Sequence, residues 1–163
     1  MSQPIAIYPT SASPPTWGHA DILRRAAGVF SRVHWVAAIN PSKETLFSTQ
    51  SRLDMMQDYV EYFKLNNVVV DSFEGSIARY AKAQEAGVIL RGLRGSQDFA
   101  TEFELSVGYR GIDDSLEVLA LFADPERVGV SSSMVRELAR LGEDITAYVS
   151  PGVAKIVLNH LHR

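Results

Sequence analysis

The sequence of 163 residues contains no cysteine, which excludes disulfides, thiolate zinc sites and a cysteine nucleophile. It also lacks an apolar run long enough to span a bilayer, and its N-terminus lacks the basic start and apolar core of a signal peptide. We therefore expect a cytoplasmic protein without a membrane partner.

Clusters of basic charge are also missing. Lys and Arg form no run and the formal net charge is −3, so the sequence argues against a general nucleic-acid binder. This balance still allows a small anionic ligand that is held by a few well-placed cations.

The overall composition is ordinary for a globular protein, with 46% hydrophobic and 21% charged residues. No repeat, low-complexity tract or linker divides the chain, and its length suits one domain. We expect a single domain over residues 1–163.

Apolar segments of strand length alternate with segments of helical period. The predicted strands are residues 5–8, 33–39, 68–70, 88–90 and 116–122, and the predicted helices are residues 22–30, 53–63, 77–86, 97–109, 132–141 and 153–161. The helix over 77–86 is expected to end at Gly87. This alternation predicts an α/β fold, a Rossmann-like doubly wound sheet of five parallel strands with helices on both faces. Ligands of such sheets bind beyond the carboxyl ends of the strands.

A proline-rich stretch, YPTSASPPTWGH at residues 8–19, connects the first strand to a helix start. A helix start presents unpaired N–H groups and a partial positive charge, so phosphate binds there readily. Gly18 would let a ligand approach the backbone, and His19 would direct an imidazole toward the same phosphate. The alternative is a plain turn with a hydroxyl cap and an exposed histidine.

A second helix start carries three serines, in the stretch VGVSSSMVR at residues 128–136. These serines supply hydroxyls and free N–H groups, and Arg127 and Arg136 add charge suited to a polyphosphate. The alternative is that one of the serines simply caps the helix.

Three further cations follow predicted strands. Arg91 and Arg94 come after the buried strand at 88–90, and Lys43 comes after the second strand. All three are expected at the sheet edge where an α/β ligand binds. The alternative is that they are solvated surface residues.

Two carboxylates, Asp98 and Glu102, lie one turn apart on the next predicted helix. Phe99 and Phe103 are expected to face the core from this helix. The two carboxylates are therefore interpreted as part of a solvated face.

Together these motifs resemble a known family. Residues 16–19 (TWGH) resemble the T/H-x-G-H signature of nucleotidyltransferases that transfer AMP or CMP to a phosphate, and residues 130–136 (VSSSMVR) resemble their second signature, I-S-S-S/T-x-x-R/K. Residues 40–43 (NPSK) and 89–94 (ILRGLR), with Asp98-Phe99, are similar to the phosphopantetheine adenylyltransferase family. The resemblance extends from about residue 5 to the last helix.

The resemblance implies an enzyme, a nucleotidyltransferase of coenzyme A biosynthesis. It would convert ATP and 4′-phosphopantetheine to dephospho-coenzyme A and pyrophosphate, with Mg²⁺ as cofactor. Phosphate oxygens and water would hold the Mg²⁺, and no residue is assigned as a metal ligand. A homohexamer and feedback by coenzyme A are also implied.

The resemblance also assigns roles to residues. His19 would stabilise charge on the α-phosphate, and Lys43 and Arg91 would hold the acceptor phosphate as the other catalytic residues. Ser11, which replaces the family's usual threonine, would join them, and Ile77 would contact the pantetheine arm. The implied ATP site comprises Ser11, Ala12, Gly18, His19, Gly92, Leu93, Arg94, Glu102, Arg127, Val128, Gly129, Val130, Ser131, Ser132 and Ser133.

The first loop departs from the family pattern, Gly-Thr/Ser-Phe-Asp/Asn-Pro, because residues 10–14 read TSASP. Thr10 stands where glycine would allow a positive φ or close ligand approach. Ala12 removes an aromatic ring and Ser13 a carboxylate or amide. The alternatives that this departure leaves open are lower activity, an altered acceptor, or a paralogue that binds nucleotide or coenzyme A without catalysis. A sister enzyme that acts on nicotinate or nicotinamide mononucleotide is a further alternative.

Overall fold

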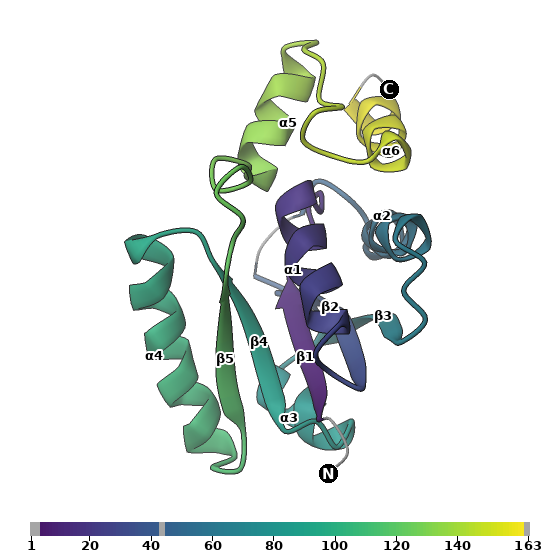
Figure 1. Cartoon of the computed structure of the whole chain (residues 1–163). Coiled ribbons are helices and arrows are strands. Elements are labelled where there is room, and N and C mark those ends of the chain that lie inside the picture. Colours follow the sequence, from purple (N-terminus) through teal and green to yellow (C-terminus); the bar gives the residue numbers. More distant parts are fainter. Residues whose placement is uncertain (1–3, 43–44, 162–163) are drawn as a thin grey trace.

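The computed structural model describes residues 4–42 and 45–161. Its centre is a sheet of five parallel strands in the order β3-β2-β1-β4-β5 (Figure 1). The strands are β1 (Ile5–Thr10), β2 (Arg32–Ile39), β3 (Val68–Glu74), β4 (Val88–Leu93) and β5 (Glu117–Phe122). The helices are α1 (Trp17–Ala27), α2 (Thr49–Tyr62), α3 (Ile77–Ala83), α4 (Ser96–Ile112), α5 (Ser132–Arg140) and α6 (Pro151–Leu161). The predicted fold class is confirmed.

Helices cover both faces of the sheet. Successive side chains of a strand point to opposite faces, so a strand that is buried on both sides must be apolar throughout. Ala6 and Trp35 belong to the larger apolar cluster, which includes residues of α1 and α2. Ile7 and Ile89 belong to the second cluster, which includes residues of α3. No helix within residues 4–42 and 45–161 is long and apolar enough to cross a membrane.

The strand order reverses between β1 and β4. β1 pairs with β2 as far as Thr10, but its register with β4 covers only Ala6 and Ile7. Pro9 has no N–H with which to extend the ladder. The Pro9 carbonyl oxygen instead accepts a hydrogen bond from Arg91 Nη1 over 3.2 Å. Beyond this reversal, the carboxyl ends of β1 and β4 are therefore free to border a ligand site.

The last two helices lie beyond the carboxyl edge of the sheet (Figure 1). The Trp17 N–H donates to the Tyr148 carbonyl oxygen over 3.0 Å, and the Ser150 N–H donates to the Tyr59 hydroxyl over 3.1 Å. These bonds tie the segment between α5 and α6 to α1 and α2.

Helix α3 ends earlier than predicted. Its last residue is Ala83, and Glu85 adopts the left-handed conformation with φ 54°. The Ala86 N–H then donates to the Ala81 carbonyl oxygen over 2.9 Å. The expected stop at Gly87 was therefore wrong, because the chain reverses two residues before the glycine.

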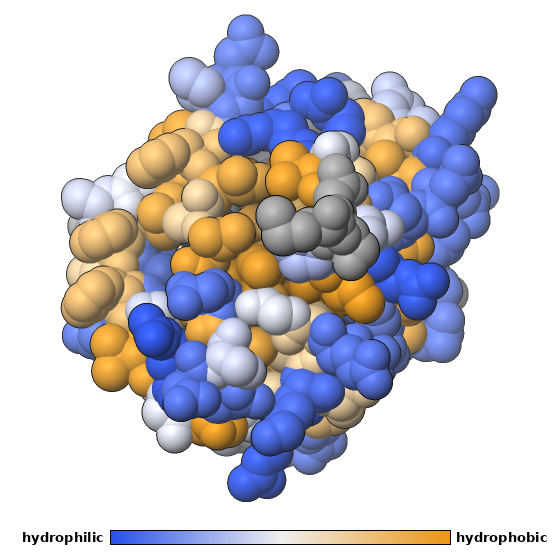
Figure 2. Space-filling model, turned by 60° about the horizontal axis from the view of Figure 1, so that its bottom comes forward, coloured by the Kyte–Doolittle hydropathy of each residue, from blue (hydrophilic) through white to orange (hydrophobic). Residues whose placement is uncertain are grey.

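The orientation of α4 was also predicted wrongly. Phe99 and Phe103 are 58% and 59% exposed, because the helix turns its Asp98, Glu102 and Tyr109 face inward. Figure 2 shows apolar side chains gathered on the side of the molecule where α4 and β5 lie. Other exposed apolar residues of these two elements are Val107, Ile112, Leu119 and Phe122.

Candidate active site

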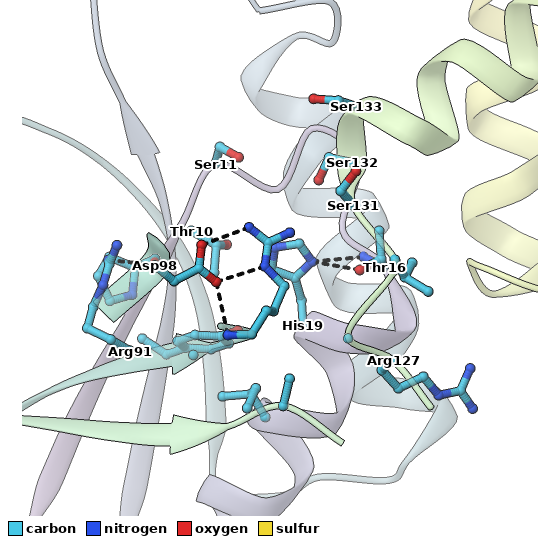
Figure 3. Close-up of a pocket in the computed structure, with 18 of the residues that line it drawn as sticks. Thr10, Ser11, Thr16, His19, Arg91, Asp98, Arg127, Ser131, Ser132 and Ser133 are labelled. Carbon is cyan, nitrogen blue, oxygen red and sulfur yellow. Dashed lines mark hydrogen bonds and ion pairs between the residues drawn. The ribbon is translucent and has the colours of Figure 1, made fainter. Parts of the chain in front are cut away.

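A cavity of about 400 Å³ lies where β1 and β4 end and α1 and α5 begin (Figure 3). Its lining comes from segments far apart in the sequence, so only the folded chain assembles it. The lining residues are Tyr8, Pro9, Thr10, Ser11, Thr16, Gly18, His19, Ile22, Arg91, Gly92, Arg94, Asp98, Glu102, Ala123, Arg127, Val130, Ser131, Ser132, Ser133 and Arg136.

His19 lies in the first turn of α1, and its orientation is fixed by the residue before the helix. The Thr16 N–H donates to His19 Nδ1 over 3.1 Å, and Thr16 Oγ1 lies 2.9 Å from the same nitrogen. Because Nδ1 accepts a hydrogen bond, the ring proton of the neutral imidazole resides on Nε2. His19 is thus held as a hydrogen-bond donor through Nε2.

Burial lowers the pKa of His19 from its usual 6.5 to about 4, and the positive charge of Arg94 also contributes to this shift. The imidazole is therefore neutral at pH 7. A neutral donor can hydrogen-bond a phosphate oxygen without first losing or gaining a proton.

Gly18 precedes His19 at the start of α1. A Cβ atom at this position would lie 3.5 Å from Thr16 Oγ1 and 3.8 Å from the Arg127 carbonyl oxygen, which are ordinary contacts. Packing within the protein therefore does not require glycine here. The small residue leaves space over the helix start, where unpaired N–H groups favour an anion.

The three serines before and in α5 have three different partners. Ser131 Oγ caps the helix by accepting from the Met134 N–H over 3.1 Å. Ser132 Oγ donates to the Pro14 carbonyl oxygen over 2.8 Å, and Ser133 Oγ accepts from Arg136 Nη2 over 3.2 Å. Capping accounts for one serine, and the other two connect α5 to the first loop and to Arg136.

Two arginines in the cavity are paired with carboxylates of α4. Arg91 Nε and Nη2 donate to the two Glu102 carboxylate oxygens over 2.5 and 2.6 Å. Arg94 Nε and Nη2 donate to the Asp98 carboxylate over 3.0 and 3.2 Å. Hydrogen bonding from Arg94 lowers the pKa of Asp98. The prediction that Asp98 and Glu102 form a solvated face was therefore wrong.

The cavity has an excess of positive charge. Four arginines and two carboxylates line it, which leaves a formal charge of +2 among the lining residues when His19 is neutral. The Arg127 guanidinium lies 6.0 Å from the centre of the Trp17 ring. Arg136, which also lines the cavity, donates to the Ser13 carbonyl oxygen. This balance suits a polyphosphate.

Hydrogen bonds to the Thr10 hydroxyl and to several carbonyl oxygens hold the end of β1 and the loop after it in place. Thr10 Oγ1 accepts from Trp35 Nε1 over 3.0 Å. Ala12, and not Thr10, adopts a positive φ, of 48°. Thr10 therefore does not need the positive φ that a glycine at this position would allow. The carbonyl oxygens of the loop accept from side chains of other elements: Ser11 from Arg52, Ser13 from Arg136, Pro14 from Ser132 and Pro15 from Tyr59.

Most of the predicted site residues meet at this cavity. Those in its lining are Ser11, Gly18, His19, Arg91, Gly92, Arg94, Glu102, Arg127, Val130, Ser131, Ser132 and Ser133. Ala12, Leu93, Val128 and Gly129 belong to the same segments but not to the lining. Ile77 is buried in the second apolar cluster, so its contact with a ligand stays a prediction. Lys43 lies outside the described residues.

Several lining residues were missed by the sequence analysis. Tyr8 lies within β1, where a strand pattern gives no sign of a ligand, and Thr10 was noted only as a departure from the family pattern. Asp98 was seen but not assigned to the site, although its spacing of four residues from Arg94 favours a pair. Arg136 was not among the residues assigned to the ATP site, although its charge was noted and it ends the second signature motif.

No group of three His, Asp or Glu side chains within residues 4–42 and 45–161 is arranged to hold a metal ion. The two carboxylates of the cavity, Asp98 and Glu102, are already engaged by Arg94 and Arg91. Mg²⁺ commonly binds through substrate phosphates and retained waters. The donor set therefore fits an ion that arrives with a polyphosphate.

Comparison with known proteins gives two kinds of likeness. The cytidylyltransferase-like family model matches residues 7–138. The phosphopantetheine adenylyltransferase of Thioalkalivibrio sulfidiphilus is 43% identical over 94% of this chain and 96% of its own length. That of Synechocystis is 39% identical over 91% and 92%.

Solved structures show the same fold at lower identity. A putative nicotinate-nucleotide adenylyltransferase from Vibrio parahaemolyticus aligns with a TM-score of 0.76 at 22% identity, over 100% of this chain and 96% of its own. A nicotinic acid mononucleotide adenylyltransferase from Plasmodium falciparum, complexed with NaAD, aligns with a TM-score of 0.71 at 15% identity, over 96% and 95%.

Proposed function

The chain belongs to the phosphopantetheine adenylyltransferases within the cytidylyltransferase-like family, and we propose that it transfers AMP from ATP to 4′-phosphopantetheine, giving dephospho-coenzyme A and pyrophosphate. One observation carries the proposal. The start of α1, with His19, and the start of α5, with its three serines, line one arginine-rich cavity.

The reaction needs positioning and charge stabilisation more than covalent chemistry. An oxygen of the acceptor phosphate attacks the α-phosphorus of ATP and forms a new P–O bond. The bond between the α-phosphorus and the bridging oxygen breaks, and pyrophosphate leaves with that oxygen. No nucleophilic side chain is required, which agrees with a cavity lined by hydrogen-bond donors.

The residues of the cavity fit these steps. His19 would donate its Nε2 proton in a hydrogen bond to an α-phosphate oxygen, where negative charge develops in the transition state. Arg91, with Ser11 and Lys43, would hold the acceptor phosphate. The serines and Arg127 would hold the triphosphate. Mg²⁺, when bound, would neutralise charge on the departing pyrophosphate.

An assay of pyrophosphate release tests the proposal. We expect release only when ATP, Mg²⁺ and 4′-phosphopantetheine are all present, and a loss of release when the Mg²⁺ is chelated. Nicotinate mononucleotide, tested in parallel, should not replace phosphopantetheine. Absence of release above the blank, or release with the mononucleotide alone, would refute the proposed reaction. Calorimetric binding of ATP without turnover would favour a non-catalytic paralogue.

A homohexamer with coenzyme A feedback accompanies this proposal. The exposed apolar residues of α4 and β5 support self-association, because β5 is an edge strand and such patches commonly mark protein contacts. Light scattering would report the mass in solution, and a monomer would contradict the hexamer. Inhibition by added coenzyme A in the same assay would test the feedback.

A further inference from the structure

Arg52 is a buried cation that lies outside the cavity. It is part of α2, its side chain is 1% exposed, and it does not line the cavity. The ion pairs formed within residues 4–42 and 45–161 all involve other side chains. Its charge therefore has no carboxylate partner in the described part of the chain.

Within residues 4–42 and 45–161, the acceptors that Arg52 contacts are all neutral. Its Nη1 donates to the carbonyl oxygens of Ser11 over 3.0 Å and Ala38 over 3.3 Å. Its Nη2 donates to Thr49 Oγ1 over 3.4 Å, and its buried Nε has no hydrogen-bond partner in the described part of the chain. A guanidinium keeps its proton in proteins, so the positive charge persists in this buried position.

Burying a charge without a counter-charge is unfavourable. Such a charge attracts an anion that binds nearby, and the attraction reaches further through protein than through water. The residue bonded to Arg52 is Ser11, which does line the cavity. Arg52 therefore contacts a residue of the cavity wall, Ser11, and the proposed function assigns Ser11 to the binding of the acceptor phosphate.

We propose that Arg52 is a positioning residue for the acceptor phosphate: it holds the Ser11 carbonyl and supplies a positive charge that the bound phosphate balances. This inference rests on the proposed function, because it takes Ser11 as part of the acceptor subsite. The competing explanation is purely structural, in which Arg52 only ties α2 to the first loop and to β2.

The two explanations differ in how they depend on ligand charge. Arg52→Met removes the charge at similar length, Arg52→Lys keeps it, and Arg140→Met is a matched control on the exposed part of α5. Calorimetry would compare 4′-phosphopantetheine with pantetheine, which lacks the phosphate. We expect Arg52→Met to weaken phosphopantetheine binding on the order of tenfold and pantetheine binding less than about twofold. Arg52→Lys should recover most of the loss, and Arg140→Met should resemble the wild type.

Each outcome decides between the explanations. Equal weakening of both ligands by Arg52→Met, or no weakening of either, would overturn the proposal. If Arg52→Met does not fold, Arg52→Gln removes the charge and keeps an N–H donor, and the same comparison applies. The binding measurement needs no turnover, so an inactive wild type would refute the proposed reaction and still leave the role of Arg52 decided by its ligand comparison.

Discussion

Residues 131–136 at the start of α5 act through their side chains, whereas residues 11–15 after β1 are held through their backbone. Ser132 and Arg136 of the first segment reach the carbonyl oxygens of Pro14 and Ser13 in the second. Arg52 and Tyr59 of α2 donate to other carbonyl oxygens of the same loop. One segment thus provides the donors and the other the acceptors.

This difference bears on the family pattern, which residues 130–136 resemble and residues 10–14 depart from. Every residue type has a carbonyl group, so bonds to carbonyl oxygens do not depend on the side chains at positions 11–13. The serines and Arg136 cannot be exchanged so freely, because their own side chains make the bonds. The altered loop is therefore compatible with an intact site, and the Thr16–His19 bond lies beyond the altered residues.

The largest effect is expected for His19→Ala, which removes a side-chain donor that no backbone group replaces. We expect kcat to fall on the order of 10²-fold or more, with a smaller change in ATP affinity, since the imidazole acts mainly in the transition state. Steady-state kinetics with both substrates would measure this. His160→Ala, in the last turn of α6, is a control that should keep wild-type rates. An unchanged kcat in His19→Ala would remove this residue from the mechanism.

A smaller effect is expected where the two segments join. Arg136→Met removes the donor to the Ser13 carbonyl oxygen and one positive charge of the cavity. We expect kcat/KM to fall about tenfold, a loss typical of one charge-assisted hydrogen bond. Ser13→Ala keeps the carbonyl group, so it should change kcat/KM less than about twofold. A larger loss in Ser13→Ala than in Arg136→Met would break the distinction between donors and acceptors.

The sequence predicted the parts of the fold that periodicity and strand alternation govern. The apolar runs of β1, β2 and β4 follow from burial on both faces, and the serines and His19 could be placed because helix starts follow strands in such folds.

The errors arose where tertiary contacts outweigh local pattern. Phe99 and Phe103 have helical spacing, but the Arg91–Glu102 pair turns the other side of α4 toward the sheet. The end of α3 depended on Glu85 taking a conformation that sequence rules assign to glycine. Arg52 gave no signal, because nothing in a helical pattern shows that an arginine will be buried against a loop 41 residues away.

The smallest effect concerns stability, and it compares the Thr10 hydroxyl at the end of β1, directly before residues 11–15, with the Ser131 hydroxyl at the start of α5. Thr10→Val leaves the Trp35 Nε1–H without its partner, which costs about 1–3 kcal/mol where the donor is buried. Ser131→Ala removes the cap of α5, which costs about 1 kcal/mol because water can replace a lost cap at a helix end. Denaturant unfolding of both variants would give the two free energies. We expect Thr10→Val to be at least as destabilising as Ser131→Ala. The reverse order would show that the bond between Trp35 Nε1 and the Thr10 hydroxyl stabilises this region less than the hydrogen bonds to the loop's carbonyl oxygens do.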